Sequence, residues 1–114
     1  MRIDELYRAI GGDYNDVLSR FMTEERVVRF VRKFPADGSF ALLQQSLKEG
    51  NAEEAFRAAH TLKGVAQNLS FTELYERAVT VTEILRGGSL NVAAEMPALE
   101  KSYLHTVKSI EALE

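Results

Sequence analysis

The 114-residue sequence contains no cysteine and no tryptophan, and it has only two prolines. Without cysteine the chain cannot form disulfides, thiolate metal sites or a cysteine nucleophile, and its composition fits a reducing compartment. No stretch approaches the ~20 apolar residues that a membrane span needs, and the first five residues lack the basic and apolar pattern of a signal peptide. We therefore expect a soluble, cytoplasmic protein with no membrane partner.

The chain also lacks an excess of positive charge. Fourteen Lys and Arg residues stand against seventeen Asp and Glu residues, which gives a formal net charge of -3. Domains that bind nucleic acid gain affinity by neutralising phosphates with basic side chains, so nucleic acid is not an expected partner. The length falls within the range of one domain, and we expect residues 1–114 to form a single unit.

Proline and glycine separate the chain into segments with helical periodicity, and no run alternates apolar and polar residues as a strand would. The predicted helices span residues 4–10, 23–34, 40–48, 51–69, 71–86 and 92–113. Because short connections make consecutive amphipathic helices antiparallel neighbours, the sequence predicts an all-α fold, an antiparallel up-and-down four-helix bundle. Its members are 23–34, 51–69, 71–86 and 92–113. Helix 4–10 is a short N-terminal addition, and helix 40–48 is a connecting flank.

Polar residues mark the expected helix starts. Thr23, Ser39 and Asn51 each stand where an N-cap side chain is needed. Ser70 stands at the corresponding position before helix 71–86, where its hydroxyl can cap that helix. Pro97 lies either in the first turn of the main body of the last helix or at a kink within it.

Helix 51–69 has two different faces when each residue is rotated by about 100°. One stripe contains the apolar positions Ala55, Ala59, Leu62, Ala66 and Leu69, with Ala58 at its margin. This stripe is the predicted core. The opposite side contains Glu53, Phe56, Arg57, His60, Lys63, Gly64 and Gln67. We therefore expect His60 to face water.

Gly64 lies one turn after His60 on the exposed side. A glycine inside a helix costs about 1 kcal/mol relative to alanine, and close packing of another helix is a weak explanation for a position that points away from the core. The missing Cβ leaves room beside His60 for a bulky group or a partner's backbone. Lys63, at the i+3 spacing, can bring its ammonium group to whatever binds there, which implies an anion.

Several chemistries are disfavoured by the same helix face. A convex surface offers no pocket for general acid-base catalysis, and no spacing suggests a hydrolytic triad. The only other histidine is His105 and there is no H-E-x-x-H pattern, so no metal site is expected.

Nucleophilic attack by an imidazole on phosphorus remains, because a histidine with its ordinary pKa of ~6.5 is largely neutral at pH 7. In-line phosphoryl transfer needs Mg²⁺ and charge-stabilising groups, which a partner must supply.

The segment from Ala59 to Ala66, Ala-His-Thr-Leu-Lys-Gly-Val-Ala, resembles the H-x-L-K-G signature of histidine-containing phosphotransfer (HPt) domains. This family is a four-helix bundle of similar length with its histidine midway along a long helix. The resemblance implies that His60 carries a phosphoryl group between receiver-domain aspartates of a two-component phosphorelay. It also implies that the receiver supplies Mg²⁺, so the chain needs no cofactor and is a carrier without enzymatic turnover. Lys63 and Gly64 match the family's basic and small positions.

Two positions depart from the family pattern. Many members have a small residue seven positions after the histidine and a glycine ten positions after it, whereas this chain has Gln67 and Ser70. The amide of Gln67 could hydrogen-bond a phosphoryl oxygen or crowd some receivers, which leaves partner choice open. The hydroxyl of Ser70 is expected to cap the following helix.

Two of the remaining candidate residues, Phe56 and Arg57, each have two possible interpretations. Phe56 is either half-buried against a neighbouring helix or an apolar anchor for a docking receiver. Arg57 is either a solvated charge or a contact for an acidic receiver surface. His105 also projects from its helix, but no glycine follows it one turn later, and we interpret it as a solvated surface residue.

The expected partners are response-regulator receiver domains, a histidine kinase, or both, and we expect the chain to be a monomer. One alternative is an HPt-type domain that an ATP-dependent kinase phosphorylates directly. Another is a helical adaptor that works without phosphorylation. A phosphohistidine phosphatase or small hydrolase is a remote option, because it would need convergent groups that a convex face does not provide.

Overall fold

The computed structural model describes all 114 residues and contains only helices, turns and loops. The elements are α1 (Ile3–Ile10), α2 (Tyr14–Phe21), α3 (Glu24–Lys33), the 3-10 turn η1 (Phe34–Ala36), α4 (Ser39–Lys48), α5 (Ala52–Asn68), α6 (Thr72–Arg86) and α7 (Met96–Glu111). The predicted all-α fold is confirmed. None of these helices combines the length and apolar character of a membrane span.

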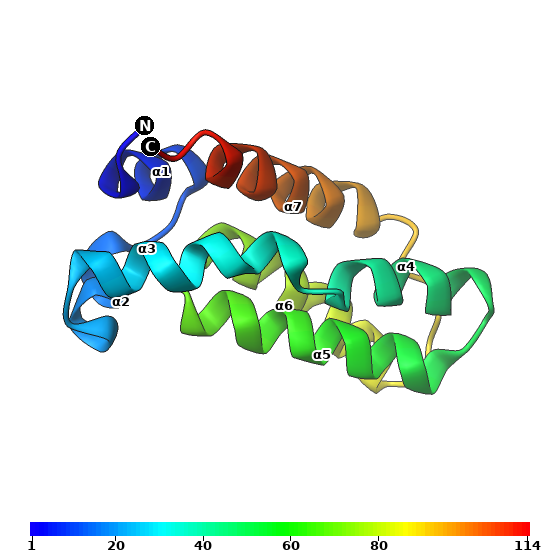
Figure 1. The fold of residues 1–114 in the computed structure, drawn as a ribbon. Helices are drawn as coiled ribbons and strands as arrows, with labels where there is room; N and C mark the ends of the chain where they lie inside the picture. The colour runs from blue at the N-terminus through cyan, green and yellow to red at the C-terminus, as the bar shows by residue number, and fades with distance from the viewer.

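The helices form an elongated bundle of 40 × 23 × 20 Å. Figure 1 shows α3 and α4 following one another in nearly one line, with α5, α6 and α7 running beside them. Helix α5 packs against both α4 and α6, and α7 packs against α6 and α1. The two chain ends meet, since the N-terminal amine of Met1 donates to the carbonyl oxygen of Ala112 at 3.2 Å.

Helix α4 has a larger role than predicted. The sequence predicts that residues 40–48 form a connecting flank, after a helix that ends before Pro35. In the structure η1 accommodates Pro35 in its first turn and the chain continues in the same direction. Phe40 and Leu43 of α4 are buried. Helices α3 and α4 together therefore make the first long member of the bundle.

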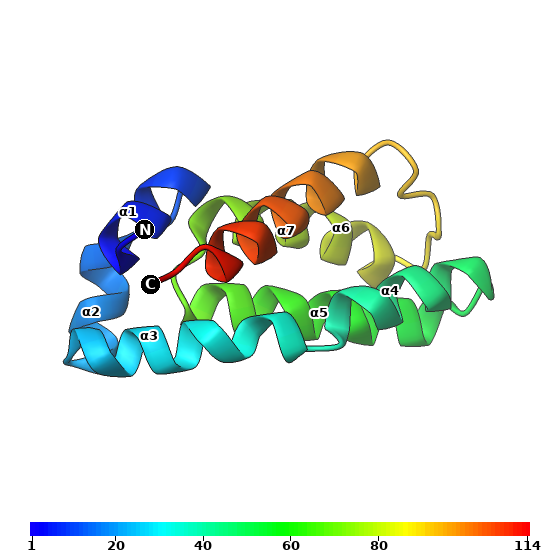
Figure 2. The same cartoon turned by 45° about the horizontal axis from the view of Figure 1, so that its top comes forward.

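Helix α2 was not predicted. Its N-cap is Asp13, whose carboxylate accepts a hydrogen bond from the backbone N–H of Asp16 at 3.0 Å. Only Val17 of this helix is fully buried. Figure 2 shows α1 and α2 together at one end of the bundle, where α5 ends and α6 begins.

The predicted caps have mixed outcomes. Thr23 and Asn51 accept hydrogen bonds from the backbone N–H groups three residues later, as expected. Pro97 lies in the first turn of α7, the first of its two predicted positions. The prediction for Ser39 is wrong, because Ser39 is already inside α4, and its backbone N–H donates to the Asp37 carboxylate at 2.9 Å. Asp37 therefore does locally what the serine was expected to do.

The end of α5 is fastened to the N-terminal helices by a buried contact. The hydroxyl of Tyr7 in α1 donates to the carbonyl oxygen of Leu69 at 2.6 Å. Burial raises the pKa of Tyr7 well above its ordinary value, so the hydroxyl keeps its proton. The backbone N–H of Asp13 also donates to the carbonyl oxygen of Ser70 at 2.9 Å. These bonds satisfy carbonyl groups that the end of a helix leaves free.

Candidate functional site

Helix α5 presents one face to the core and the other to solvent. The side chains of the predicted core stripe are all buried: Ala55, Ala58, Ala59, Leu62, Ala66 and Leu69. Four of the six are alanines, whose small side chains let α4 and α6 pack closely against α5 from two sides. On the opposite side His60, Gly64 and Gln67 are exposed, and Phe56 and Lys63 are partly exposed. The predicted orientation of the helix is confirmed.

The imidazole of His60 is free of partners within the chain. No hydrogen bond or ion pair engages it, although its neighbours Arg57 and Thr61 are hydrogen-bonded or ion-paired. Its nearest aromatic neighbour is Phe56, one turn earlier, with ring centroids 5.8 Å apart and planes inclined by 38°. Another molecule can therefore reach the ring nitrogens without first breaking an internal contact.

Gly64 borders open space. A Cβ atom built on Gly64 would meet no neighbouring atom within 4 Å. The ordinary reason for a glycine in a helix interior, close approach of another segment, does not apply here. The cost of about 1 kcal/mol relative to alanine is therefore not repaid by packing inside this chain. What the glycine provides is room on the surface one turn from His60.

Phe56 connects the His60 face to the end of α6. Its ring is partly buried, as one of its two predicted readings has it. The guanidinium carbon of Arg86 lies 5.0 Å from the centre of that ring, within the range of a cation-π contact. Arg86 also pairs with Glu83 at 3.3 Å. Arg86 therefore lies against the aromatic ring that neighbours His60.

Arg86 was not singled out from the sequence, because it belongs to the last turn of a different helix. Its place follows from the hairpin of α5 and α6, which brings the end of α6 beside the start of α5 (Figure 1). The available signal was a basic residue in the last turn of the next antiparallel helix.

The two basic residues predicted on this face differ in how they are engaged. Arg57 forms ion pairs with Glu54 at 2.9 Å and with Glu53 at 3.8 Å. Lys63 is partly buried and forms no ion pair. The ammonium group of Lys63 is therefore the cation on this face that no carboxylate neutralises, while Arg57 would have to share its charge with Glu54.

Ser70 does not cap α6, and that prediction is wrong. Its backbone lies in the left-handed region with φ 56°, and α6 begins after Phe71 with no side-chain cap. The Ser70 hydroxyl instead donates to the Asp16 carboxylate at 2.7 Å and accepts from the Arg20 guanidinium at 2.9 Å. This backbone conformation favours glycine, and here the serine turns its side chain toward α2 rather than α6.

Asp16 and Arg20 of α2, together with Ser70, form a polar cluster that holds the end of α5 in place, and we call this cluster the α5 anchor. The Ser70 hydroxyl and the Arg20 guanidinium hold the pKa of the Asp16 carboxyl below its ordinary value, because both donate hydrogen bonds to the charged form. Arg20 also donates to the carbonyl oxygen of Asn68 at 2.8 Å. Gln67 borders the same small hollow as Asp16 and Ser70. The far end of the His60 face is therefore fixed to α2.

A family model for the Hpt domain matches residues 35–113. The chain belongs to the Hpt domain family. A search of curated proteins and a search of solved structures each gave no significant match. The matched region begins at Pro35 and includes α4 to α7, with His60 and its face. Helices α1, α2 and α3 precede it.

Membership in the Hpt family indicates the general function of the chain. Hpt domains take part in histidine phosphotransfer in phosphorelays, as carriers of the phosphoryl group rather than as catalysts. The surroundings of His60 include the partly buried ring of Phe56, the unpaired ammonium group of Lys63 and the open space at Gly64. Mg²⁺ prefers carboxylate and phosphate oxygens, and no group of three or more His, Asp or Glu side chains is placed to hold a metal ion.

Proposed function

We propose that His60 of this Hpt domain is the residue that accepts and donates the phosphoryl group, in exchange with an aspartate of a receiver domain. The observation that carries the proposal is the open space at Gly64 beside an exposed imidazole without internal partners. A phosphoryl group on His60 needs that volume, and a docking domain needs access to it.

The transfer step has a simple balance. A ring nitrogen of neutral His60 attacks the phosphorus of the receiver's aspartyl phosphate, and an N–P bond forms as the acyl phosphate P–O bond breaks. The aspartate carboxylate leaves with the electron pair of that bond, and the other ring nitrogen gives up its proton to water. The reverse sequence passes the phosphoryl group to another receiver aspartate. Because the ring nitrogen needs no base before it attacks, the carrier needs no second catalytic group of its own.

The neighbours of His60 have supporting roles in this proposal. Lys63 offsets part of the negative charge on the phosphoryl oxygens, since its ammonium group is free of carboxylates. Gly64 leaves room for those oxygens, and Gln67 offers an amide toward them or limits which receivers fit. Phe56 and Arg57 contact the docked receiver at the start of α5, and Arg86 adds positive charge beside Phe56.

The remaining requirements fall on the partner. In-line phosphoryl transfer needs Mg²⁺ and a carboxylate cluster, and we assign both to the receiver. The partners are thus response-regulator receivers, a histidine kinase, or both. The monomeric state and cytoplasmic location expected from the sequence stay predictions. Nothing in the fold favours one direction of flow.

The proposal is tested by incubating the purified chain with a panel of phosphorylated receiver domains and Mg²⁺. The chain should acquire a label that acid removes and base preserves, as expected for a phosphoimidazole. A separate arm with an autophosphorylated histidine kinase, without any receiver, distinguishes direct phosphorylation by a kinase. A chain that no member of the panel and no kinase labels would contradict the proposal and leave a phosphorylation-independent adaptor as the better account.

A further inference from the structure

The outward face of α3 concentrates positive charge that the protein does not neutralise. Helix α3 has four basic residues and two acidic ones, although the whole chain carries a net charge of -3. Arg26, Arg29 and Lys33 are exposed and form no ion pair. Arg32, in contrast, is engaged, because it donates to the carbonyl oxygen of Glu114 at 2.6 Å.

Aromatic and apolar side chains lie beside these cations. The ring of Phe30 stacks on that of Phe21 across the α2–α3 turn, with centroids 4.8 Å apart and planes inclined by 28°. The ammonium group of Lys33 lies 5.1 Å from the centre of the Phe30 ring. Phe30 is nevertheless 38% exposed, and Met22 at the turn is 72% exposed. Aromatic residues with adjacent arginine are typical of the energetic centres of protein interfaces.

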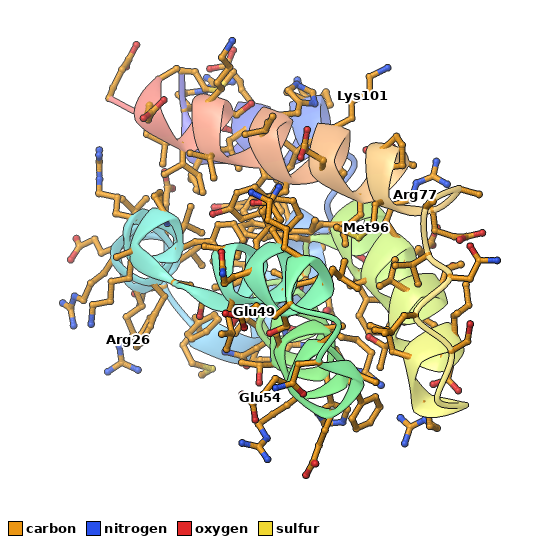
Figure 3. All side chains as sticks on the ribbon, turned by 90° about the vertical axis from the view of Figure 1, so that its right-hand side faces the viewer. Arg26, Glu49, Glu54, Arg77, Met96 and Lys101 are labelled. Carbon is orange, nitrogen blue, oxygen red and sulfur yellow. The ribbon has the colours of Figure 1, made fainter.

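This surface adjoins the face that carries His60. Arg20, which donates to the carbonyl oxygen of Asn68 at the end of α5, directly precedes Phe21. From His60 to Asn68 the helix rises about 12 Å at the standard rise per residue. Figure 1 shows the α2–α3 turn on the α5 side of the bundle, away from α1 and α7. In Figure 3, Arg26 of α3 extends into solvent on the side of the view opposite Lys101 of α7.

We propose that the hairpin surface, composed of Phe21, Met22, Arg26, Arg29, Phe30 and Lys33, is a second docking contact for the receiver domain that reaches His60. The inference rests on the proposed function. The hairpin surface has unneutralised cations around an exposed aromatic ring. It is complementary to a partner surface that has acidic side chains around an apolar side chain. A receiver domain that covers α5 from Phe56 to Gln67, and that extends beyond the end of this helix, would then contact the hairpin surface.

The hairpin surface also gives the contact a role in partner choice. It lies outside residues 35–113, which match the Hpt family model. The face around His60 falls within the matched region, whereas the hairpin surface is carried by the N-terminal helices. A receiver with acidic side chains at the corresponding place is favoured over one with basic side chains there, because like charges across an interface are costly.

The test compares two double variants of equal charge. Arg26→Glu with Arg29→Glu changes the hairpin surface, and Lys101→Glu with Lys108→Glu changes the exposed face of α7 by the same charge. We measure phosphoryl transfer to the full chain as a function of receiver concentration, at low and at physiological salt. The hairpin variant should need about ten times more receiver for half-maximal rate, with the maximal rate unchanged and a weaker salt dependence. The α7 variant should stay within twofold of the native chain.

Binding without chemistry separates this inference from the proposed function. Titration of each unphosphorylated receiver into His60→Gln protein, with and without the two arginine changes, reports docking alone. If receivers bind and the hairpin variant weakens them, the inference holds even where no label reaches His60. Equal effects of the two double variants, or no binding by any receiver, would overturn it. Hairpin-dependent binding to phosphatidylserine vesicles, with receiver binding unaffected, would also overturn it and assign the surface to anionic lipid. Thermal unfolding of every variant confirms that it is folded.

Discussion

The protein has two exposed histidines on two helices, and their local surroundings begin alike. His60 of α5 is followed three residues later by Lys63, and His105 of α7 is followed three residues later by Lys108. Both imidazoles are exposed, and each has a flexible cation one turn away. Exposure and a neighbouring lysine therefore do not distinguish a phosphoacceptor from a solvated histidine.

The position four residues after each histidine separates the two regions. After His60 it is Gly64, where an added Cβ would meet nothing within 4 Å. After His105 it is Ser109, which is 8% exposed and packs into the bundle. The α5 helix thus gives up about 1 kcal/mol of helix stability for open volume, whereas α7 uses the same position for packing. Unfilled space beside the ring, rather than the ring alone, is therefore what distinguishes the proposed site from His105.

The largest expected effect comes from removing each histidine in turn. His60→Gln should abolish detectable phosphoryl transfer, because no other side chain on that face has a comparable nucleophile. His105→Gln should transfer within twofold of the native rate. Single-turnover assays with one phosphorylated receiver measure both variants. Loss of phosphoryl transfer in His105→Gln, or retained transfer in His60→Gln, would contradict the proposed difference between the two histidines.

Filling the space at Gly64 should separate stability from function. Gly64→Ala should raise the free energy of unfolding by about 0.5–1 kcal/mol, since alanine is the better helix former. Gly64→Leu should lower the transfer rate on the order of 100-fold, because displacement of the reacting groups by ~1 Å has costs of that size. Gly64→Ala should fall between Gly64→Leu and the native chain. Denaturant unfolding and transfer assays on the same samples check both trends, and a native rate for Gly64→Leu would contradict the account.

The two lysines offer a smaller, matched test. Lys63→Ala should slow transfer roughly fivefold, because an exposed charge-assisted contact contributes modestly to stabilising phosphoryl oxygens. Lys63→Arg should retain most of the rate, and Lys108→Ala should change it less than twofold. Rates at saturating receiver are the relevant measurement. Equal losses for Lys63→Ala and Lys108→Ala would mean that net charge, rather than position beside His60, explains the effect.

The smallest effect on transfer is expected at the anchor of α5, where stability changes instead. Hydrogen bonds from Ser70 and Arg20 keep the pKa of Asp16 below its ordinary value of 3.8. A carboxyl with a lowered folded pKa contributes stability that is present above its ordinary pKa and is lost as pH falls through the folded pKa. Asp16→Asn should therefore lower the unfolding temperature at pH 7, by progressively less as pH falls below 4.

The control for the anchor is Glu111→Gln, which removes the same charge from an exposed residue without an ion pair. It should leave the unfolding temperature nearly unchanged at pH 7. Both variants should transfer phosphoryl within twofold of the native rate at pH 7. An Asp16→Asn penalty that stays constant from pH 7 to pH 3 would show that the carboxylate charge is not what the anchor uses.

The orientation of α5 could be predicted because it depends on one helix alone. Alanine and leucine recur at helical spacing on one side, and a helix can bury only that side while Gly64 stays out. The caps at Thr23 and Asn51 were predictable for the same reason, since each bond closes within three residues.

What could not be predicted depends on contacts between distant segments. Ser70 turns toward Asp16, 54 residues away, rather than toward the helix that it precedes. Arg86 meets Phe56 only through the α5–α6 hairpin. Helix α2 is a different case, because Tyr14, Val17, Leu18 and Phe21 do follow helical spacing, but the helix has only eight residues and follows a glycine pair that indicates a helix end. The Asp13 cap was a second local signal for this helix.

The difference between the two histidines is tested most directly by locating the phosphoryl group. The native chain, phosphorylated by a receiver, is digested and analysed by tandem mass spectrometry at neutral to basic pH, where a phosphoimidazole survives. We expect the phosphoryl group on the peptide containing His60 and none on the peptide containing His105. Phosphoryl groups shared equally between the two, or found only on His105, would contradict it.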